Sequence, residues 1–273
     1  MRIAVIGNCQ ARPFRHCLEA LAGPFDDAVT INVANAETHR AILADRDLIF
    51  AQPDLPQTLS DEHQAKLVTY PKLSTSSFHP DCRVFHTDGG GFIDGPLRQF
   101  HSLIIAAGYL EGLSPPRIEK LFNAYVYARL GYMDRVNLHL ETLIKHCLSQ
   151  NYDFTGFVRD TQQEAFMFTP NHPRVSILYI AAQQALQRCG VKAKANARPP
   201  ADEIDRNFFW PFYPEIAAQS GRRGSEMIFR NFTEAFDLNA LIPLYCKYYA
   251  EHGAPGGDRV EAARRVLRQE LAL

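Results

Sequence analysis

Residues 1–22 read MRIAVIGNCQARPFRHCLEALA, and this stretch organises the rest of the chain. Ile3–Ile6 is a short apolar run with β-branched residues, which is typical of a buried strand in a parallel sheet. Gly7 and Asn8 interrupt the run, and from Gln10 onward the apolar residues recur at helical spacing. The stretch therefore predicts a strand, a tight turn and a helix.

The predicted turn carries the residues best suited to chemistry. A strand–turn–helix connection directs backbone N–H groups and the positive end of the helix dipole to one place, which suits an anion. Cys9 lies in this turn, where a thiol is expected to have a lowered pKa and to be a better nucleophile. Arg12 and Arg15 add positive charge nearby. The alternative is that Cys9 only packs as a small residue in a common α/β opening.

Composition excludes several functional classes. The 273 residues carry a net charge of −1 with scattered basic residues, so no nucleic-acid footprint is visible. No stretch reaches the length of a transmembrane helix, and the start of the chain does not have the pattern of a signal peptide. The six cysteines show neither a Cys-x-x-Cys pair nor zinc-ligand spacing, which predicts no metal and a reduced, cytoplasmic protein.

The first part of the chain continues as alternating strands and helices. Further strands are expected at Ala28–Ala34, Asp47–Ala51 and Lys66–Tyr70, with a short helix around Glu37–Ala44. This alternation predicts a parallel sheet, whose ligands gather beyond the carboxyl ends of the strands. Asn8-Cys9, Gln52-Pro53 and the loop from Pro71 are therefore expected on one rim.

The remainder of the chain is predominantly helical. Apolar residues at helical intervals predict helices at Leu97–Leu110, Pro115–Leu130, Asp134–Leu148, Val175–Cys189 and Asp258–Leu271. The fold class is thus α/β, with a small N-terminal parallel sheet and a mainly α-helical remainder. We expect an α/β part at residues 1–95 and a helical part at residues 96–273, packed as one compact unit.

Two histidines are candidates for a general base. His79 precedes Pro80 in the loop from Pro71, and Asp81 is suited to orient it, although the same residues also fit a simple turn. Asn171 and His172 stand at the entrance of the helix expected from Val175. There Asn171 is a candidate cap, and the helix dipole would keep His172 neutral.

Two further stretches carry arginines and aromatic residues that could bind a ligand. Residues 221–224, Gly-Arg-Arg-Gly, place two guanidiniums between glycines and suit either a phosphate clamp or a solvated turn. Residues 207–216 form a dense aromatic cluster with two prolines, which predicts a rigid packed loop running into a helix, or the wall of an apolar pocket.

Four motifs in order give the chain a family resemblance. They are Gly7-Asn-Cys-Gln10, Phe78-His-Pro-Asp81, Asn171-His-Pro173 and Trp210-Pro-Phe-Tyr-Pro214. Together they resemble the WcbI-type capsular polysaccharide biosynthesis proteins over residues 2 to about 230. The resemblance implies coenzyme A, or acetyl-coenzyme A, in a cleft between the motifs. It points to Gly7, Asn8, Cys9, Gln10, His79, Asp81, Asn171 and His172 as site residues.

The resemblance implies an O-acyltransferase, with acetyl as the expected acyl group and a sugar hydroxyl as the acceptor. Arg12 or Arg15 would bind the cofactor's phosphates, and His172 or His79 would act as base. Cys9 either accepts the acyl group first or only lines the site.

Three other functions stay open. They are a cysteine phosphatase built on Cys9 and Arg15, an esterase similar to GDS lipases, and a coenzyme A-binding protein without turnover. The phosphatase reading is weakened by Pro13, which lacks the N–H that such a loop needs.

Overall fold

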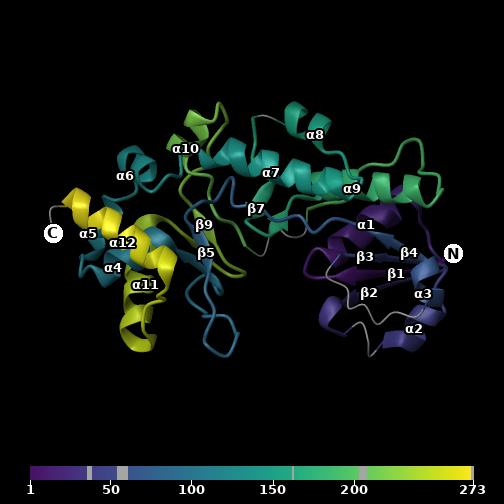
Figure 1. Ribbon diagram of the computed structural model, residues 1–273, viewed down its shortest axis with the longest axis horizontal. Coiled ribbons are helices and arrows are strands. Elements are labelled where there is room, and N and C mark those ends of the chain that lie inside the picture. The colour runs from purple at the N-terminus through teal and green to yellow at the C-terminus, as the bar shows by residue number, and fades with distance from the viewer. Residues whose placement is uncertain (36–38, 54–60, 162, 203–207, 272–273) are drawn as a thin grey trace. The chain divides into compact units, whose positions relative to one another are not determined.

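The computed structural model describes residues 1–35, 39–53, 61–161, 163–202 and 208–271 of the chain. It contains two compact units (Figure 1). Unit 1 comprises Met1–Ser74, Thr142–Thr161 and Asn171–Ile204, and unit 2 comprises Thr75–Glu141, Gln162–Pro170 and Asp205–Leu273. The units interleave along the chain, unlike the single boundary near residue 95 that the sequence suggests.

Unit 1 is built on the predicted parallel sheet. Its strands are β1 (Arg2–Gly7), β2 (Asp27–Asn32), β3 (Leu48–Ala51) and β4 (Leu67–Thr69). They lie in the order β2-β1-β3-β4, and every neighbouring pair is parallel. The apolar run that predicted the first strand therefore forms a central strand, which explains why Ile3, Ala4, Val5 and Ile6 are all fully buried.

Helices cover both faces of this sheet (Figure 1). Alternate strand residues, including Ile6 and Ile49, pack on one face against Leu43 of α2 (Arg40–Ala44). On the other face, Phe50 meets Phe14 of α1 (Ala11–Ala22), with 6.2 Å between ring centroids. The period-two alternation of side chains along each strand thus produces an α/β/α sandwich.

Besides the end of α7 (Arg135–Ser149), unit 1 contains several short helices, one short strand and the long helix α9. They are η1 (Val33–Asn35), α3 (Asp61–Ala65), α8 (Thr155–Asp160), the two-residue strand β8 (His172–Pro173) and α9 (Val175–Arg188). Helix α9 packs against α1. Gly190 follows the end of α9 with a φ of +72°, the left-handed conformation that commonly terminates a helix. Part of the short helix expected around residues 37–44 lies outside the described residues.

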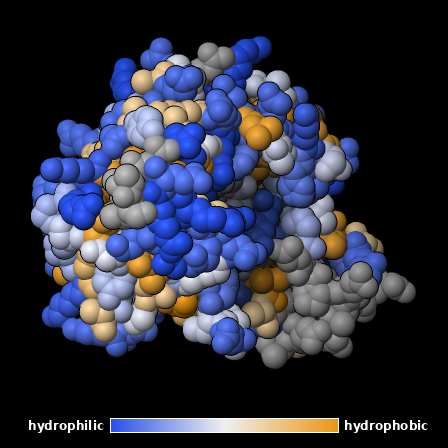
Figure 2. Space-filling model, turned by 60° about the vertical axis from the view of Figure 1, so that its left-hand side comes forward, coloured by the Kyte–Doolittle hydropathy of each residue, from blue (hydrophilic) through white to orange (hydrophobic). Residues whose placement is uncertain are grey.

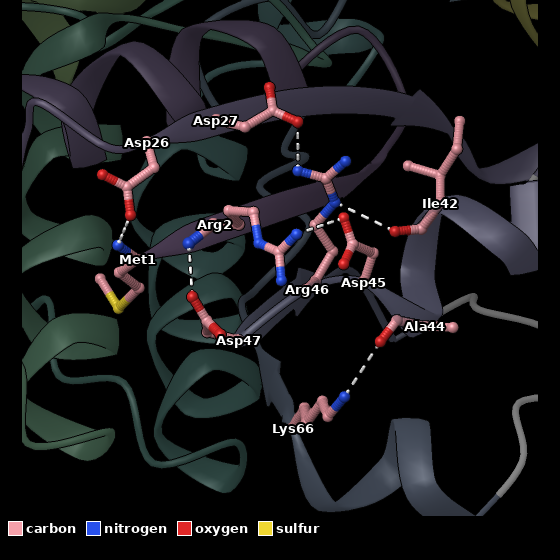
Figure 3. A network of polar contacts seen from close by, with 10 residues as sticks. All are labelled: Met1, Arg2, Asp26, Asp27, Ile42, Ala44, Asp45, Arg46, Asp47 and Lys66. Atoms are coloured by element: carbon pink, nitrogen blue, oxygen red, sulfur yellow. Dashed lines mark hydrogen bonds and ion pairs between the residues drawn. The ribbon is translucent and has the colours of Figure 1, made fainter.

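A network of charged groups closes the amino ends of the strands (Figure 3). Arg46 donates to the carboxylate of Asp27 and, at 3.0 Å, to the carbonyl oxygen of Ile42. The backbone N–H of Arg2 donates to Asp47 at 2.6 Å. The Arg46–Asp27 ion pair connects the start of β3 with that of β2, and the Arg2–Asp47 hydrogen bond connects β1 with the start of β3, so these contacts fix this end of the sheet.

Unit 2 is mainly helical. Its helices are α4 (Leu103–Leu110), α5 (Pro115–Glu119), α6 (Ala124–Arg129), the first part of α7 (Arg135–Ser149), α10 (Pro214–Gln219), α11 (Leu238–His252) and α12 (Asp258–Leu271). Its short strands are β5 (Cys82–Val84), β6 (Phe100–Ser102), β7 (Met167–Thr169), β9 (Phe229–Arg230) and β10 (Ala235–Phe236). The mixed α/β class is therefore confirmed, with helices predominating after the sheet.

Two helix predictions in unit 2 are wrong in their extent. The helix expected from Leu97 starts only at Leu103, because the side chain of Ser102 accepts the N–H of Ile105 and caps it there. The helix expected over Pro115–Leu130 is broken in two, since Asn123 caps α6 by accepting the N–H of Val126 at 3.0 Å. In both places a polar side chain satisfied the backbone and overrode the apolar period.

The aromatic cluster and the last helix behave as the sequence predicts. Trp210, Phe212 and Tyr213 are buried, and the loop runs into α10. Helix α12 packs against α4. In Figure 2, hydrophilic residues cover most of the visible face, with hydrophobic ones scattered among them. No helix in the described part of the chain combines the length and hydropathy needed to cross a membrane.

Candidate functional site

The predicted turn lies at the carboxyl end of β1, and hydrogen bonds hold its shape. The backbone N–H of Asn8 donates to Oε1 of Gln52 at 3.0 Å, which ties the end of β1 to the end of β3. The side-chain oxygen of Asn8 accepts the N–H of Gln10 at 2.9 Å, and its carbonyl accepts the N–H of Ala11 at 3.0 Å. The turn therefore leads directly into α1.

This position is the topological switch point of the sheet. The chain leaves β1 for β2 on one side, and β3 then adds on the other side of β1. Ligands of open α/β sheets bind at such a point, beyond the carboxyl ends of the strands. The contacts of Gln52 and Leu73 with the turn confirm the predicted rim.

Gly7 is required by close packing beneath the turn. A Cβ atom at this position would lie 2.4 Å from the hydroxyl oxygen of Tyr70 and 2.9 Å from Oε1 of Gln52. The Tyr70 hydroxyl itself donates to the carbonyl of Ile6 at 3.2 Å. Gly7 thus makes room for the groups that hold the turn and has no side chain to offer a cofactor.

Gln10 is a buried clamp. Its Nε2 donates to the carbonyl oxygens of Leu73, at 2.6 Å, and Asn171, at 3.0 Å. Its Oε1 accepts from the N–H of Leu73, at 3.1 Å, and from Nε2 of Gln52, at 3.2 Å. These bonds use both donors and both lone pairs of the amide. Gln10, expected to bind the cofactor, is therefore engaged with three loops of the protein itself.

Cys9 is exposed on this rim, but its pKa is not lowered as the sequence suggests. Desolvation by the surrounding protein raises the pKa of the thiol, whereas a hydrogen bond with its own backbone N–H and the positive charge of Lys72 lower it by less. Several turn amides are engaged within the protein, so they offer little to a thiolate. The resting thiol is consequently protonated at neutral pH.

The other five cysteines are less accessible than Cys9. Cys17, Cys82 and Cys147 are buried, and Cys189 and Cys246 are half-buried. Burial raises the pKa of each of these thiols. Cys9 is therefore the thiol best placed to meet a ligand.

The two arginines expected beside the turn have different surroundings. Arg12 is exposed on the first turn of α1. Arg15 forms an ion pair with Glu19 at 2.5 Å and reaches the carbonyl of Ala28, which lies near the amino end of β2, at 3.5 Å. Arg15 is thus drawn away from Cys9, because its i,i+4 partner lies further along the helix.

Asn171 and His172 also lie in unit 1, but not as a helix cap. Helix α9 is capped at Arg174, and the N–H of Val175 donates to the carboxylate of Asp202 at 3.1 Å. Burial lowers the pKa of His172 to about 4, so its imidazole is neutral at pH 7. The predicted neutral form is thus present, but through burial in β8 and not through a helix dipole. Asn171 contacts the turn through its backbone carbonyl on Gln10.

Asp81, in unit 2, anchors the start of α4. Its carboxylate accepts hydrogen bonds from Ser102 at 2.5 Å, the N–H of Ile104 at 2.9 Å, Tyr213 at 2.8 Å and Tyr132 at 3.2 Å. Burial raises the pKa of Asp81, whereas these hydrogen bonds lower it because they favour the charged form. This arrangement engages both oxygens and gives Asp81 a structural task.

His79 is buried in the same turn as Asp81. Its carbonyl accepts the N–H of Cys82 at 3.1 Å, and its ring lies edge-on to Phe78. Nearby, Arg222 of the Gly-Arg-Arg-Gly stretch lies over the ring of Phe78 at 5.7 Å from its centroid. The stretch therefore uses one guanidinium for packing on an aromatic face.

Lys72 and Tyr70 are neighbours of Cys9 in addition to those expected from the sequence. Both lie within three residues of the end of β4, where the rule that ligands bind beyond the carboxyl ends of parallel strands could have pointed to them. Among the described residues, no three histidine, cysteine or acidic side chains gather as a metal site would require.

Comparison with known proteins places these features in a family context. Residues 2–194 match the family described as polysaccharide biosynthesis enzyme WcbI. A solved WcbI structure is 13% identical, with a TM-score of 0.67 over 99% of this chain and 96% of the other. That structure is described as native protein without a disulfide bond between coenzyme A and one of its cysteines. No curated protein matches the chain.

Proposed function

Because this chain belongs to the WcbI family of polysaccharide biosynthesis enzymes, we propose that it is a coenzyme A-dependent O-acyltransferase. Its acceptor is a hydroxyl group of a sugar or polysaccharide precursor, and its acyl group is acetyl. The six free thiols fit a reducing compartment, so we place the reaction in the cytoplasm.

The observation that carries this proposal is the exposed thiol of Cys9 at the switch point of the sheet. A thiol on this rim suits a ligand whose own reactive end is a thiol or thioester. The similar WcbI structure is described as native protein without a disulfide bond between coenzyme A and a cysteine, and this mention of coenzyme A together with a cysteine supports the same pairing here.

The rim supports the sulfur end of coenzyme A better than its phosphates. The N–H groups of Asn8, Gln10 and Ala11 are used within the protein, and Arg15 is paired with Glu19. We assign Arg12, which is exposed on the first turn of α1, and Lys72, whose positive charge acts on Cys9, to anionic parts of the ligand near this turn. When bound, the cofactor supplies an acyl group activated as a thioester.

His172 is our candidate for the base. A neutral imidazole can accept the proton that the sugar hydroxyl loses during attack on the acyl carbon. His172 follows Asn171, whose carbonyl accepts from Gln10, so its backbone is tied to the residue after Cys9. Its low pKa keeps it ready as an acceptor, although it makes the imidazole a weak base before the substrate is bound.

We favour direct transfer over an acyl-cysteine intermediate. The raised pKa of Cys9 keeps the resting thiol protonated, and a protonated thiol is a poor nucleophile. Asn8 suits the developing oxyanion, because the bond from Gln10 to its Oδ1 orients the amide and leaves Nδ2 to donate.

The phosphatase alternative lacks its essential arginine. Such a loop needs the guanidinium of Arg15 to return to the thiol, whereas Arg15 pairs with Glu19 and points toward Ala28. The structure offers no comparable argument for an esterase.

The test is thiol release from acetyl-coenzyme A with methyl glycosides of neutral and acidic sugars as acceptors. We expect His172→Ala to lose about 10²–10⁴-fold in rate. Cys9→Ala should retain measurable activity. Wild-type protein incubated with acetyl-coenzyme A should carry no acetyl adduct. Cys246→Ala and His146→Ala are matched controls and should keep the wild-type rate.

Other outcomes separate the alternatives. An acetyl adduct on Cys9, together with an inactive Cys9→Ala protein, would replace direct transfer by a covalent relay. Binding of coenzyme A without turnover on any acceptor would reduce the protein to a binding module.

A further inference from the structure

Unit 2 contains a cavity of about 450 Å³, a size typical of small-ligand sites. Its walls come from β5, α4, α6, α7 and α12 and from the segments between them. The lining residues are Ser76, Arg83, Leu103, Arg129, Leu130, Tyr132, Arg135, Leu138, His139, Arg259, Ala262, Ala263 and Val266.

The cavity lining concentrates positive charge. Four arginines line it, Arg83, Arg129, Arg135 and Arg259, while none of the lining residues is an aspartate or a glutamate. The whole chain carries a net charge of only −1, so this cluster is a local excess. A chain gains little stability by gathering guanidiniums, which repel one another, unless an anion joins them.

The four arginines differ in their exposure to solvent. Arg83 is only 7% exposed, Arg135 is half-buried, and Arg129 and Arg259 are exposed. The cavity lining thus combines a buried guanidinium with guanidiniums that an anion can reach from solution.

Arg83 supplies the strongest single observation. Its Nη1 donates to the carbonyl of Cys82 at 2.8 Å, but its buried Nε has no hydrogen-bond partner in the described part of the chain. A buried N–H without a partner is unfavourable and marks a place where a ligand can complete the bonding. The nearby Asp81 carboxylate does not do so, since it is held by the four donors described above.

The neighbouring side chains are fixed in place around this charge. The guanidinium of Arg135 lies 5.7 Å from the ring centroid of Tyr132, whose hydroxyl donates to Asp81. His139 is held through Nδ1 by the hydroxyl of Ser76 at 2.9 Å. Burial and the charges of Arg83 and Arg259 lower the pKa of both Arg135 and His139, so these groups sense one another electrostatically.

We propose that this cavity is a binding site for the phosphoryl group of a ligand. Arginine forks bind phosphate oxygens in pairs, and several converging forks favour a multiply charged group over a single carboxylate. Leu103, Leu130 and Val266 supply apolar walls for the uncharged body of that ligand. The phosphoryl group belongs either to coenzyme A or to a phosphorylated sugar.

The site does not depend on acyl transfer at Cys9. A Cys9→Ala protein should therefore bind inorganic pyrophosphate as the wild type does, even if the proposed reaction fails.

The test is calorimetric titration of the full chain with inorganic pyrophosphate. Arg259→Gln and Arg135→Gln should each weaken binding by about tenfold or more. Arg265→Gln, an exposed arginine on the same helix α12 that does not line the cavity, is the matched control and should bind within about twofold of wild type. Circular dichroism confirms that each variant is folded.

Further titrations identify the source of the phosphoryl group. If Arg259→Gln weakens coenzyme A and not glucose 1-phosphate, the cavity serves the cofactor. The reverse result assigns it to a phosphorylated sugar, and methyl glucoside serves as the neutral control. Failure of pyrophosphate to bind the wild type, or equal binding to wild type and both cavity variants, would overturn the proposal.

Discussion

The side-chain amide of Gln10 donates to the backbone carbonyl of Asn171 at 3.0 Å, although 161 positions separate the two residues. The same amide holds Leu73 through two further bonds. One buried glutamine thus links the Cys9 turn, the loop after β4 and the segment that carries His172. The arrangement of the candidate site rests on this residue.

Replacing Gln10 should therefore destabilise the protein and loosen the rim. We expect Gln10→Ala to lower the free energy of unfolding by about 2–4 kcal/mol, because it leaves the N–H and carbonyl of Leu73 and the carbonyl of Asn171 unsatisfied. Urea denaturation measures the change. Gln183→Ala, at an exposed position of α9, is the control and should cost little. Equal free energies of unfolding for the two variants would show that the hydrogen bonds of Gln10 do not contribute to stability.

Much of this site follows from local sequence, and the rest does not. The apolar run at Ile3–Ile6 and the break at Gly7 define a central strand and its turn without any distant information. The partners of Gln10, by contrast, come from loops far along the chain, and no local pattern announces them. The i,i+4 pair of Arg15 with Glu19 could have been found, since that spacing is visible in the sequence.

The cationic cavity shows the same limit. Its arginines stand at positions 83, 129, 135 and 259, and the sequence around each one by itself predicts no binding site. Only the packing of α12 on α4 brings residues of such different segments to one cavity. The predicted starts and ends of two helices were wrong for another reason, because single capping residues, Ser102 and Asn123, overrode a periodic apolar pattern.

Gly7 should not tolerate a side chain. We expect Gly7→Ala to cost about 1–3 kcal/mol, because its Cβ would lie 2.4 Å from the Tyr70 hydroxyl. Tyr70→Phe in the same chain should recover part of this loss, since it removes the colliding atom. Gly156→Ala is the control: apart from its chain neighbours and the backbone of α8 itself, nothing lies within 4 Å of its Cβ position, so it should stabilise by about 0.5–1 kcal/mol. Thermal melts of the variants decide, and absence of any recovery in the double variant would contradict the steric explanation.

His172 should make stability depend on pH on the acid side. Its pKa falls from 6.5 to about 4 on folding, so between these values the unfolded chain binds the proton and the folded chain does not. Stability is therefore fully present above pH 6.5 and is lost as the pH falls toward 4, by about 3 kcal/mol at most. His172→Gln should flatten the curve of unfolding free energy against pH in this window. His101, whose pKa burial also lowers, leaves part of the slope.

The exposed His146 provides the comparison for that experiment. His146→Gln should keep the wild-type slope between pH 4 and pH 6.5, measured by urea denaturation at each pH. Identical slopes in the wild type and His172→Gln would mean that His172 is not buried in its neutral form.

Alkylation should reach Cys9 before the other thiols, through exposure and not through a low pKa. Cys9 is the exposed cysteine, while burial protects Cys17, Cys82 and Cys147. Because its pKa is raised, the rate with iodoacetamide should keep rising with pH beyond neutrality and show no plateau near pH 7. Peptide mapping after brief labelling measures both the site and the rate.

Both the loss of the Lys72 charge and the binding of coenzyme A should slow the alkylation of Cys9. Lys72→Gln removes a positive charge that lowers the pKa of Cys9, so alkylation below pH 9 should slow, whereas Lys247→Gln should leave the rate unchanged. Coenzyme A should protect Cys9 and leave the slow labelling of Cys246 as it was. If coenzyme A protected both thiols equally or neither of them, Cys9 would not be at the cofactor's sulfur, and the carboxyl rim of the sheet would have to be abandoned as the acyl-transfer site.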